Sequence, residues 1–553
     1  MAAQTHSKVG IEPASLPPGE QPCDVVVVGA GAAGMTAALI AADLGLSVMV
    51  IEQSHLVGGT TAVSGGAVWV PANHHMTAAG AADSLEDART YLRATLGNAF
   101  DAAKVDAYLA TGPALIAYLE SASRLAFRAG PLPDYYSSLP GGTPRWRALD
   151  PLPLPARALG ADIDLLRPPH PQTIVFGTAF TTGEVGTILR KDRGWIGLVA
   201  RRVAARYLDL AWLLRRRGSP RLTLGNALAA RLLLSLRDRG VPVLTRTALR
   251  DLVSTDGRVA GVLAQRGGEL IRIEARKGVI LAGGGFGANA AMRAQWLPRS
   301  PDVDCGVAPA DINTGEAIAA GIAAGAATDL MDEAWWIPVF RMPRAGITSG
   351  QFFDRAFPGS IIVNREGRRF ANDAANYDEI GRAMANAAGA PGATFYPVFD
   401  ETYRRKYIAG PLVPMPRIAD GLLDADTRDL VASASSLAEL AARTGIDGAA
   451  LEDTVRRFNA FARSGRDEDF HRGEEPYERH YSDPRAEPNS TMAPITRPPF
   501  HAIPVRAGDI GTKGGLATNP DGQVLDRAGS VIPGLYAAGN TAASMMGRTY
   551  PAG

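Results

Sequence analysis

Residues 24–66 read DVVVVGAGAAGMTAALIAADLGLSVMVIEQSHLVGGTTAVSGG, and this stretch decides the fold. A run of four valines ends in a GxGxxG turn formed by Gly29, Gly31 and Gly34. A helix-forming segment follows, and a second apolar run ends at Glu52. Strand, glycine turn, helix, strand and terminal acid in this order are typical of a dinucleotide-binding unit, whereas an isolated GxGxxG is not. The stretch therefore predicts a Rossmann-like α/β domain.

The three glycines and the acid have separate expected roles. Gly29 permits the tight turn, Gly31 lets the backbone approach a pyrophosphate, and Gly34 lets the helix pack closely on the strand. The phosphates then bind at the free N–H groups and the positive dipole end of the helix. Glu52 has nearly the spacing expected for a carboxylate that accepts a hydrogen bond from a ribose hydroxyl.

A second glycine-rich segment with several hydroxyl groups follows the second strand, at residues 58–66. A second close approach of backbone to ligand suits a large cofactor in an extended pose, so FAD fits better than NAD, whose enzymes do not need this loop. The cofactor-binding residues that we expect are Gly29, Gly31, Ala32, Ala33, Gly34, Glu52, Gly58, Gly59, Thr60, Thr61, Ser64, Gly65, Gly66, Ala248, Gly283, Gly539 and Asn540.

Composition narrows the class of protein. The chain has 553 residues, 46% apolar and 20% charged, which is typical of a soluble globular protein with two or more domains. A net charge of +1 gives no overall field for nucleic acid, so no such partner is expected. Cys23 and Cys305 cannot form a disulfide framework or a CxxC site. The histidines lack metal-ligand spacing, and we interpret His74-His75 as a loop pair, so no metal site is expected.

The chain divides by composition into four parts. Residues 1–22 lack the apolar core of a secretory signal and are expected to be a disordered tail. No apolar run is long enough to span a membrane, so a cytoplasmic location is the default. We expect an FAD-binding domain over 23–300, an α+β substrate or catalytic domain over 301–487, and a return to the FAD-binding domain over 488–553. Within 221–282 the patterns predict a helix (221–240), a short strand (241–244), a hairpin (259–264 with 270–275) and a buried strand (278–282).

Residues 151–220 are interpreted as an insertion that ends in one basic helix over 195–217. Its apolar residues share one face by their three-four spacing, namely Ile196, Val199, Val203, Tyr207, Leu210 and Leu214. Its arginines are Arg201, Arg202, Arg206, Arg215, Arg216 and Arg217. Residues 194–218 could therefore make a peripheral membrane contact. The alternative is a core-facing helix with a solvated arginine edge, and the sequence leaves both open.

A late segment reveals a family resemblance. Residues 533–540 read PGLYAAGN, a strand that runs into a glycine turn, and together with DVVVVGAGAAG they resemble the succinate dehydrogenase/fumarate reductase-type FAD flavoprotein superfamily. Within that superfamily the chain is most similar to the 3-ketosteroid Δ1-dehydrogenase family. The segments that carry this likeness are GGTTAVSGGAVWVPAN (58–73), PDYYSSLPGG (133–142), PGSIIVNREGRRFAND (358–373), DFHRGEEPYERHYSDP (469–484) and GNTAASMMGRTYPAG (539–553).

The resemblance also shows what this chain lacks. Fumarate reductases link FAD to a histidine just before the matching threonine-rich turn, and Gly59 stands there, so noncovalent FAD is implied. The stretch that corresponds to their dicarboxylate-binding motif is the apolar WWIPVF (335–340), which suits a flat hydrophobic ring system. A second GxGxxG with a preceding strand is absent, so the expected electron acceptor is a quinone, a dye or oxygen.

The resemblance assigns catalytic roles to three tyrosines. Tyr550 matches the donor to the 3-keto oxygen, and a second donor is expected from a backbone N–H at position 554, one residue beyond this sequence. Tyr377 matches the base that abstracts a proton, and Tyr135 matches its hydrogen-bond partner. Tyr136 is a less favoured substitute for Tyr135. The expected substrate-binding residues are Phe353, Phe352 and Tyr136.

The implied activity is FAD-dependent 1,2-dehydrogenation of 3-ketosteroids in bacterial steroid degradation. One alternative is a 3-ketosteroid Δ4-(5α)-dehydrogenase or a fumarate reductase-like enoate reductase. Another is a noncatalytic flavin-binding or membrane-attached protein. The family continues past Tyr-Pro-x-Gly with a glycine-rich turn and a helix, so we expect the sequence to be truncated at its C-terminus.

Overall fold

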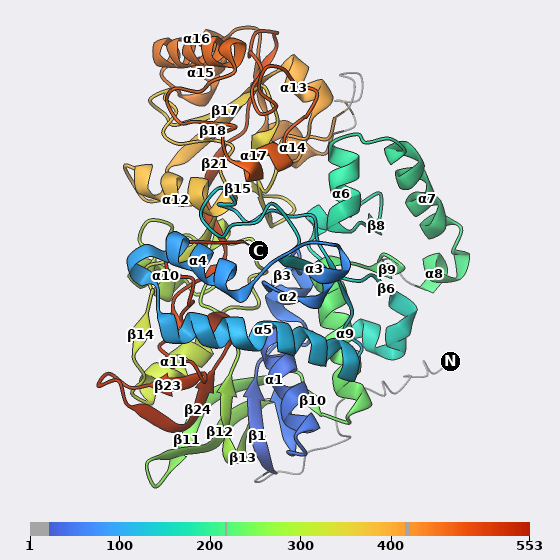
Figure 1. The fold of residues 1–553 in the computed structure, drawn as a ribbon, viewed down its shortest axis with the longest axis vertical. Helices are drawn as coiled ribbons and strands as arrows, with labels where there is room; N and C mark the ends of the chain where they lie inside the picture. Colours follow the sequence, from blue (N-terminus) through green and yellow to red (C-terminus); the bar gives the residue numbers. More distant parts are fainter. Residues whose placement is uncertain (1–20, 216–217, 415–420, 422, 553) are drawn as a thin grey trace.

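The structure is a computed structural model that describes residues 21–215, 218–414, 421 and 423–552 (Figure 1). Most of the tail expected at 1–22 lies outside these residues. Its last two residues do not belong to a tail, because Gln21 and Pro22 begin strand β1 (Gln21–Val28) and pair with Ile273 and Glu274.

The first sheet contains the strand–turn–helix unit that the sequence predicts. Its order is β10-β2-β1-β13-β12-β11, and β24 lies beside β13 with β23 as its neighbour. The bounds are β2 (Val48–Ile51), β10 (Val243–Leu244), β11 (Thr247–Thr255), β12 (Arg258–Arg266), β13 (Glu269–Leu281), β23 (Gln523–Leu525) and β24 (Val531–Ala537). Strands β10, β2, β1, β13 and β24 run parallel, so the valines of β1 are buried on both faces. The Rossmann-like prediction is confirmed.

Local predictions in this sheet hold with small changes. The expected hairpin is β12–β13, and the buried strand expected at 278–282 continues its second arm without a break. The helix expected at 221–240 is shorter, because a strand, β9 (Arg221–Leu222), precedes α9 (Leu224–Asp238). Helix α9 packs on α1 (Ala32–Asp43) and α2 (Gly59–Val63).

The second sheet is mainly antiparallel and belongs to the α+β part. Its order is β16-β15-β21-β18-β20-β19, with β17 beside β18. The strands are β15 (Ala334–Met342), β16 (Ile347–Gly350), β17 (Ser360–Val363), β18 (Thr394–Asp400), β19 (Ala432–Ala434), β20 (Phe500–Ala502) and β21 (Val505–Thr512). The nearby helices are α12 (Tyr377–Ala387), α13 (Glu401–Lys406), α14 (Ala425–Leu430), α15 (Leu437–Thr444), α16 (Gly448–Ser464) and α17 (Pro476–His480).

The second sheet corrects the boundary expected at residue 488. Strands β20 and β21 follow that boundary but pair with β18 and β15, so residues 500–512 belong to the second sheet. The chain rejoins the first sheet only at β23 and β24. Composition could not reveal this, because the backbone pairing of β21 with β15 leaves no local sequence signal.

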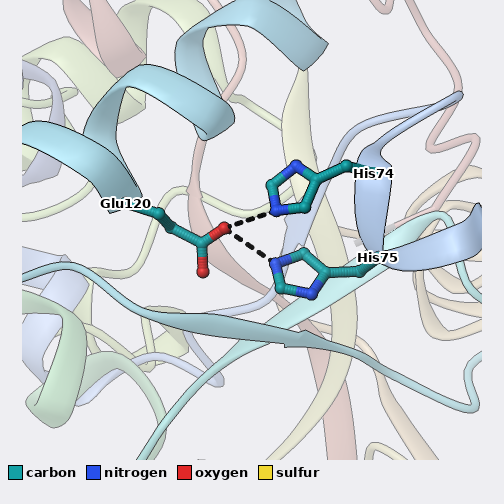
Figure 2. Close-up of side chains that lie close together, drawn as sticks. All are labelled: His74, His75 and Glu120. Carbon is teal, nitrogen blue, oxygen red and sulfur yellow. Dashed lines mark hydrogen bonds and ion pairs between the residues drawn. The ribbon is translucent and has the colours of Figure 1, made fainter. Parts of the chain in front are cut away.

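A small sheet and three helices connect the N-terminal part to the centre of the molecule. The sheet contains β3 (Val68–Trp69), β4 (Phe127–Ala129) and β5 (Ala148–Pro151), and the helices are α3 (His74–Ala78), α4 (Leu85–Leu96) and α5 (Ala102–Ala122). The interpretation of His74-His75 as a loop pair is wrong, because both residues open α3. Asn73 makes this possible by accepting a hydrogen bond from the Met76 N–H. Both imidazoles contact Glu120 of α5 (Figure 2).

The insertion closes on itself, because β6 (Leu154–Pro155) pairs with β9. It carries β7 (Ile174–Val175), β8 (Thr178–Ala179) and α6 (Thr182–Leu189). The single helix expected over 195–217 is instead α7 (Trp195–Tyr207) and α8 (Leu210–Arg215). Asp209 separates them, since its carboxylate accepts from the Trp212 N–H at 3.1 Å and begins the second helix. Arg216 and Arg217 lie outside the described residues.

The apolar residues of α7 and α8 bear on the interpretation of the basic segment as a core-facing helix. Ile196, Leu210 and Leu214 are 65%, 67% and 89% exposed. The helix pair is therefore not core-facing along this stripe. In Figure 1, α6, α7 and α8 project to the right of both sheets. Among the described residues, no helix is long and apolar enough to cross a bilayer.

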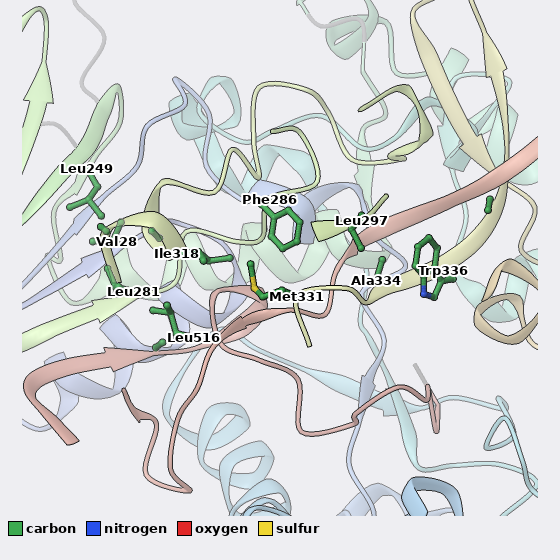
Figure 3. Close-up of a cluster of buried hydrophobic side chains, with 14 of the residues drawn as sticks. Val28, Leu249, Leu281, Phe286, Leu297, Ile318, Met331, Ala334, Trp336 and Leu516 are labelled. Carbon is green, nitrogen blue, oxygen red and sulfur yellow. The ribbon is translucent and has the colours of Figure 1, made fainter. Parts of the chain in front are cut away.

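One hydrophobic cluster runs through both parts of the molecule (Figure 3). It contains Val28 and Leu281 from the first sheet, and Trp336 and Phe340 from the second. Short strands β14 (Thr328–Asp329) and β22 (Gly515–Leu516) lie between them, with helices α10 (Ala290–Trp296) and α11 (Glu316–Ala323). The two parts are thus joined by packed side chains as well as by the chain.

Candidate active site

The GxGxxG turn shows which glycine is free to face a ligand. A Cβ on Gly29 (φ 106°) would lie 2.3 Å from the Ala282 carbonyl oxygen, and one on Gly34 would lie 2.0 Å from the Gly29 oxygen. Both positions exclude side chains for packing reasons. Gly31 differs, because a Cβ there would meet nothing nearer than Thr61 Oγ1 at 3.8 Å. The open side of the turn is therefore at Gly31.

The N-terminus of α1 is suited to an anion. Gly31 is its N-cap and has no side chain of its own to cap the helix, and the first turn has no acidic residue. The Ala32 N–H donates to Thr61 Oγ1 at 2.9 Å, so the helix start is tied to the second glycine loop. The N–H groups and the positive dipole end of this twelve-residue helix favour a phosphate group.

The second glycine loop lies against the first. A Cβ on Gly59 would be 3.8 Å from the Gly31 Cα, so the two glycines face each other. Thr60 Oγ1 accepts from Asn313 Nδ2 at 2.8 Å, and the Ser64 hydroxyl donates to the Thr61 oxygen at 2.9 Å. Gly58 and Gly66 have φ values of 105° and 69°, and Gly65 has open space beside it.

Glu52 holds the glycine turn in place. Its Oε2 accepts from the Ala30 N–H at 2.9 Å, and its Oε1 accepts from the Ser54 N–H at 2.8 Å. Burial raises the pKa of this carboxyl, and the two backbone bonds oppose that rise. Each oxygen has a further lone pair, so acceptance from a ribose hydroxyl stays a prediction.

An open cleft of about 570 Å³ lies beside the segment that follows Glu52. It is lined by Gln53, Ser54, His55, Arg246 and Asp311. Half-buried Ala248 follows Thr247, whose N–H donates to the Glu52 carbonyl oxygen at 2.8 Å.

The glycine turn at residues 29–34 and the second glycine loop at residues 58–66 together form a cradle. Strand β24 brings the end of the chain to this cradle. Gly539 follows β24, and a Cβ on it would lie 3.0 Å from Ala33 Cβ. A Cβ on Gly283 would lie 2.9 Å from Ala317 Cβ. Asn540 Oδ1 accepts from Trp335 Nε1 at 3.4 Å, which links the cradle to β15. Two facing glycine loops, a helix start without acidic residues and a third glycine turn fit an extended dinucleotide such as FAD.

Three tyrosines that are far apart in the sequence meet beside the cradle. The ring centroids of Tyr135 and Tyr377 are 5.6 Å apart, those of Tyr135 and Tyr550 are 5.1 Å apart, and those of Tyr377 and Tyr550 are 5.6 Å apart. Tyr377 is the first residue of α12, and Tyr550 lies in the C-terminal segment. The structure thus brings together all three tyrosines that the sequence singles out.

The neighbouring aromatic residues differ in their position. Phe352 contacts the Tyr377 ring at 5.4 Å, whereas Phe353 stacks on Tyr481 at 4.6 Å, one ring further away. The geometry therefore favours Phe352 over Phe353 as the neighbour of Tyr377. Tyr135, and not Tyr136, contacts both other tyrosines; Tyr136 is half-buried, and its N–H donates to the Tyr91 hydroxyl at 3.4 Å.

Burial and hydrogen bonds act in opposite directions on the pKa values of Tyr377 and Tyr550. Burial raises the pKa of Tyr377 well above its usual value, and a hydrogen bond with Tyr135 opposes that rise. Burial also raises the pKa of Tyr550, while its hydrogen bond with Tyr377 lowers it. Tyr377 occupies the first turn of a helix, where the positive dipole end favours a phenolate. The adjacent Asp378 and Glu379 work against that effect.

Buried polar contacts fix the positions of Tyr135 and the C-terminal segment. The Tyr135 N–H donates to the Pro551 oxygen at 2.8 Å, and the Tyr91 hydroxyl donates to the same oxygen at 2.5 Å. Asp134 accepts from Trp69 Nε1 at 2.8 Å and from Arg147 at 2.8 Å. The tyrosines therefore sit on a rigid support.

A buried ion pair, which no sequence pattern predicts, lies behind the tyrosine cluster. Lys513 Nζ is 3.1 Å from Asp378 Oδ1 and donates to the Thr549 oxygen at 3.0 Å. It also lies 4.6 Å from the centre of the Trp335 ring, which contacts Tyr550. Burial lowers the pKa of Lys513 to about 8, and Asp378 opposes that shift. Lys513 thus joins the residue after Tyr377 to the residue before Tyr550.

Two further aromatic residues that the sequence analysis does not assign to the site, Tyr477 and Tyr481, also belong to the cluster. Tyr477 lies 4.8 Å from Tyr135, and Tyr481 lies 5.3 Å from Tyr477. Both come from the PYERHY part of residues 469–484, so their aromatic character was a usable signal. The donor expected at position 554 lies outside the sequence.

Comparison with known proteins agrees with this geometry. Residues 24–553 match the family described as FAD binding domain. The 3-oxosteroid 1-dehydrogenase of Mycobacterium tuberculosis (strain ATCC 25618 / H37Rv) is 41% identical over 545 residues, which cover 96% of this chain and 95% of that protein. The 4-oxocyclohex-2-ene-1-carboxylate 5-dehydrogenase of Sinomonas cyclohexanicum is 35% identical over 543 residues, which cover 96% of this chain and 90% of that protein.

A solved structure is similar over the same length. The crystal structure of 3-ketosteroid delta1-dehydrogenase from Sterolibacterium denitrificans in complex with 1,4-androstadiene-3,17-dione has a TM-score of 0.91 and 38% identity, and covers 96% of each chain. The glycine cradle, the strand order of the first sheet and the similarity to these dehydrogenases together identify the protein as an FAD-dependent oxidoreductase. The chain belongs to the FAD binding domain family and, within it, to the family of the 3-oxosteroid 1-dehydrogenases.

Proposed function

We propose that this protein removes one hydrogen from carbon 1 and one from carbon 2 of a 3-ketosteroid. The observation that carries the proposal is the meeting of Tyr135, Tyr377 and Tyr550 beside the glycine cradle. The likeness to enzymes that are named for this reaction, over nearly the full length, supports it.

Tyr550 binds the ketone. Its hydroxyl donates to the 3-keto oxygen, which gains negative charge as carbon 2 loses its proton. The segment that carries Tyr550 is held on both sides, by Lys513 at the Thr549 oxygen and by Tyr91 and Tyr135 at the Pro551 oxygen. A donor that is fixed before the reaction needs no reorganisation as the charge develops.

Tyr377 takes the proton from carbon 2. A phenol is a base only when it is ionised, and Tyr135 lowers the cost of that ionisation by its hydrogen bond. When bound, FAD supplies the acceptor, its N5 atom, for the hydride that leaves carbon 1. With the proton on Tyr377 and the hydride transferred, the remaining electron pair forms the double bond between carbons 1 and 2.

The surrounding side chains suit a flat apolar ring system. Trp335, Phe352 and Tyr477 are in ring contact with the three tyrosines. Burial against aromatic faces favours a steroid over a small charged acid, since a carboxylate would need a cation in the pocket. The Lys513 cation is already paired with Asp378.

Product analysis tests this function. The holoenzyme is incubated with androst-4-ene-3,17-dione and an artificial electron acceptor, and in parallel with 4-oxocyclohexanecarboxylate. We expect a 1,4-diene from the steroid and much slower turnover of the monocyclic acid. A new double bond at another ring position would indicate the Δ4-(5α) reaction, and preference for the acid would overturn the substrate assignment.

We further infer that FAD is bound without a covalent link. Gly59 occupies the position where the linked members of the superfamily have a histidine, and a Cβ on it would lie 3.8 Å from the Gly31 Cα. Acid precipitation of the holoenzyme should release all of its flavin into the supernatant. Flavin that stays with the precipitated protein would contradict this.

After turnover, the electrons of the reduced flavin pass to a quinone or another acceptor. Reoxidation assays with a soluble quinone can test this step.

We also propose a peripheral contact with an anionic lipid surface through α7 and α8. Half of the large apolar side chains that are exposed in the described residues lie within residues 175–214. They are Val175, Phe176, Ile196, Tyr207, Leu208, Leu210 and Leu214. Arg193 and Arg201 are exposed on the same lobe, which gives charge complementarity to acidic headgroups. A steroid partitions into lipid, so such a contact would place the enzyme near its substrate.

Vesicle sedimentation tests the lipid contact. The protein should sediment with phosphatidylcholine vesicles that contain phosphatidylglycerol, and less with phosphatidylcholine alone. A variant with Leu210→Ser and Leu214→Ser should lose this binding, whereas Leu270→Ser, at a leucine of the β12–β13 hairpin that is 61% exposed, should keep it. Equal sedimentation of the variant and the parent would contradict the proposal.

A further inference from the structure

Two histidines and a glutamate converge on one point away from the tyrosine cluster (Figure 2). His74 Nε2 and His75 Nε2 lie 2.9 Å and 2.8 Å from the same atom, Glu120 Oε2. The two imidazole rings have centroids 4.2 Å apart, and both point from α3 toward α5. In the part of the chain that the structure describes, this is the one group of three side chains with metal-ligand atoms that lie within 4.8 Å of one another.

The glutamate is oriented as a metal ligand would be. Its Oε1 accepts from the Phe127 N–H at 2.7 Å, which fixes the carboxylate and leaves Oε2 facing the imidazoles. Ligand carboxylates in metal sites are commonly held by such a second hydrogen bond. Two imidazole nitrogens and one carboxylate oxygen form a donor set that binds Zn²⁺ and other divalent transition metals and leaves positions open to water.

The geometry needs only a small adjustment to accept an ion. Bonds of about 2.0–2.2 Å in a tetrahedral site place ligand atoms roughly 3.4 Å apart, so each contact must lengthen by roughly 0.5 Å. His74 is 49% exposed and His75 is 21% exposed, so both rings have room to move.

We propose that His74, His75 and Glu120 bind one divalent transition-metal ion of the Zn²⁺ type, which clamps the start of α3 to the end of α5. The clamp is structural. It would fix the turn after β3, because Glu120 is also bonded to β4 through Phe127. Sequence spacing could not show the site, since Glu120 lies 45 residues from His75.

Metal titration of the FAD-loaded protein tests the proposal. The protein, stripped of metals with a chelator, is titrated with Zn²⁺ by calorimetry and with Co²⁺ by visible absorption. We expect one ion per chain, and a thermal midpoint that rises with Zn²⁺. His74→Ala and Glu120→Gln should each weaken binding by at least about 10-fold. His471→Ala is the matched control, because it removes an exposed histidine that contacts one glutamate but has no third ligand.

Each outcome of the titration decides whether His74, His75 and Glu120 bind a metal ion. Loss of the bound ion and of the thermal shift in His74→Ala and Glu120→Gln, but not in His471→Ala, supports the clamp. No saturable binding by the parent protein, or equal binding by all variants, would overturn it. The thermal shift is read without steroid turnover, so the test is independent of the proposed reaction.

Discussion

Tyr377 is enclosed by aromatic rings that oppose its ionisation, and this has a consequence for pH. Burial raises its pKa above the usual value near 10, so in the free enzyme the phenolate is a minor form at neutral pH. A base acts only when it is deprotonated, so kcat/KM should increase as the pH rises through the neutral and alkaline range. Tyr135→Phe removes the hydrogen bond that lowers this pKa, and should move the rise to higher pH. A pH-rate profile that is flat, or that falls with pH, would exclude Tyr377 as the base.

Tyr550 is expected to stabilise negative charge on the keto oxygen. Removing one such donor typically slows the chemical step by about 100- to 1,000-fold. Tyr550→Phe should therefore lower kcat by about that factor while the FAD content, read from the flavin absorbance of the purified protein, stays the same. A variant that keeps its kcat and changes only KM would show that Tyr550 binds the steroid without stabilising the charge.

Lys513 is a positioning residue, because it acts through Asp378 and the Thr549 carbonyl oxygen. Lys513→Met removes both contacts and leaves Asp378 with Arg382 at 3.1 Å as its remaining cation. We expect kcat to fall by about 10-fold with a smaller change in KM, since the two tyrosines that flank these contacts lose their alignment. Lys513→Arg, which keeps the charge, should recover part of the loss. An unchanged kcat in Lys513→Met would assign the lysine to folding alone.

At the scale of elements, the glycine turn separates binding from packing. Gly31 has space for a Cβ and a φ of −83°, whereas a Cβ on Gly34 would overlap the Gly29 oxygen at 2.0 Å. Gly31→Ala should therefore fold with an unchanged thermal midpoint as apoprotein, but bind FAD more weakly. Gly34→Ala should lower the midpoint of the apoprotein itself. Calorimetry of both variants with and without added FAD provides the comparison, and the opposite pattern would refute the assignment.

The elements that the sequence predicted well are those with a local signal. The turn at 29–34 and the β12–β13 hairpin are encoded within a few residues. The apolar spacing does not predict the break at Asp209, because that spacing continues across it while the Asp209 carboxylate begins a second helix. The second-sheet role of β21 and the cluster at Lys513 depend on pairings between distant segments, which periodicity cannot reveal. The tyrosines were found by family resemblance, and their contact with each other came from the fold.

At the scale of the whole molecule, the shared core predicts cooperative unfolding. Trp336 is fully buried in the cluster that joins both sheets, and its Nε1 donates to Glu333 Oε2 at 3.0 Å. Trp336→Ala should cost about 3–5 kcal/mol in the free energy of unfolding, from lost burial and the cavity. Far-UV circular dichroism and the release of FAD should then shift together in a denaturant titration. Two separate transitions would show that the two parts unfold independently.

We propose that the tyrosine-lined ketone site beside the FAD cradle introduces a double bond between carbons 1 and 2 of the steroid. The most direct test mixes the FAD-loaded protein with androst-4-ene-3,17-dione under anaerobic conditions and identifies the steroid after a single turnover. We predict bleaching of the flavin and one equivalent of the 1,4-diene per flavin, with neither change in Tyr377→Phe. An unchanged steroid, a double bond at another position, or full activity of Tyr377→Phe would contradict the account.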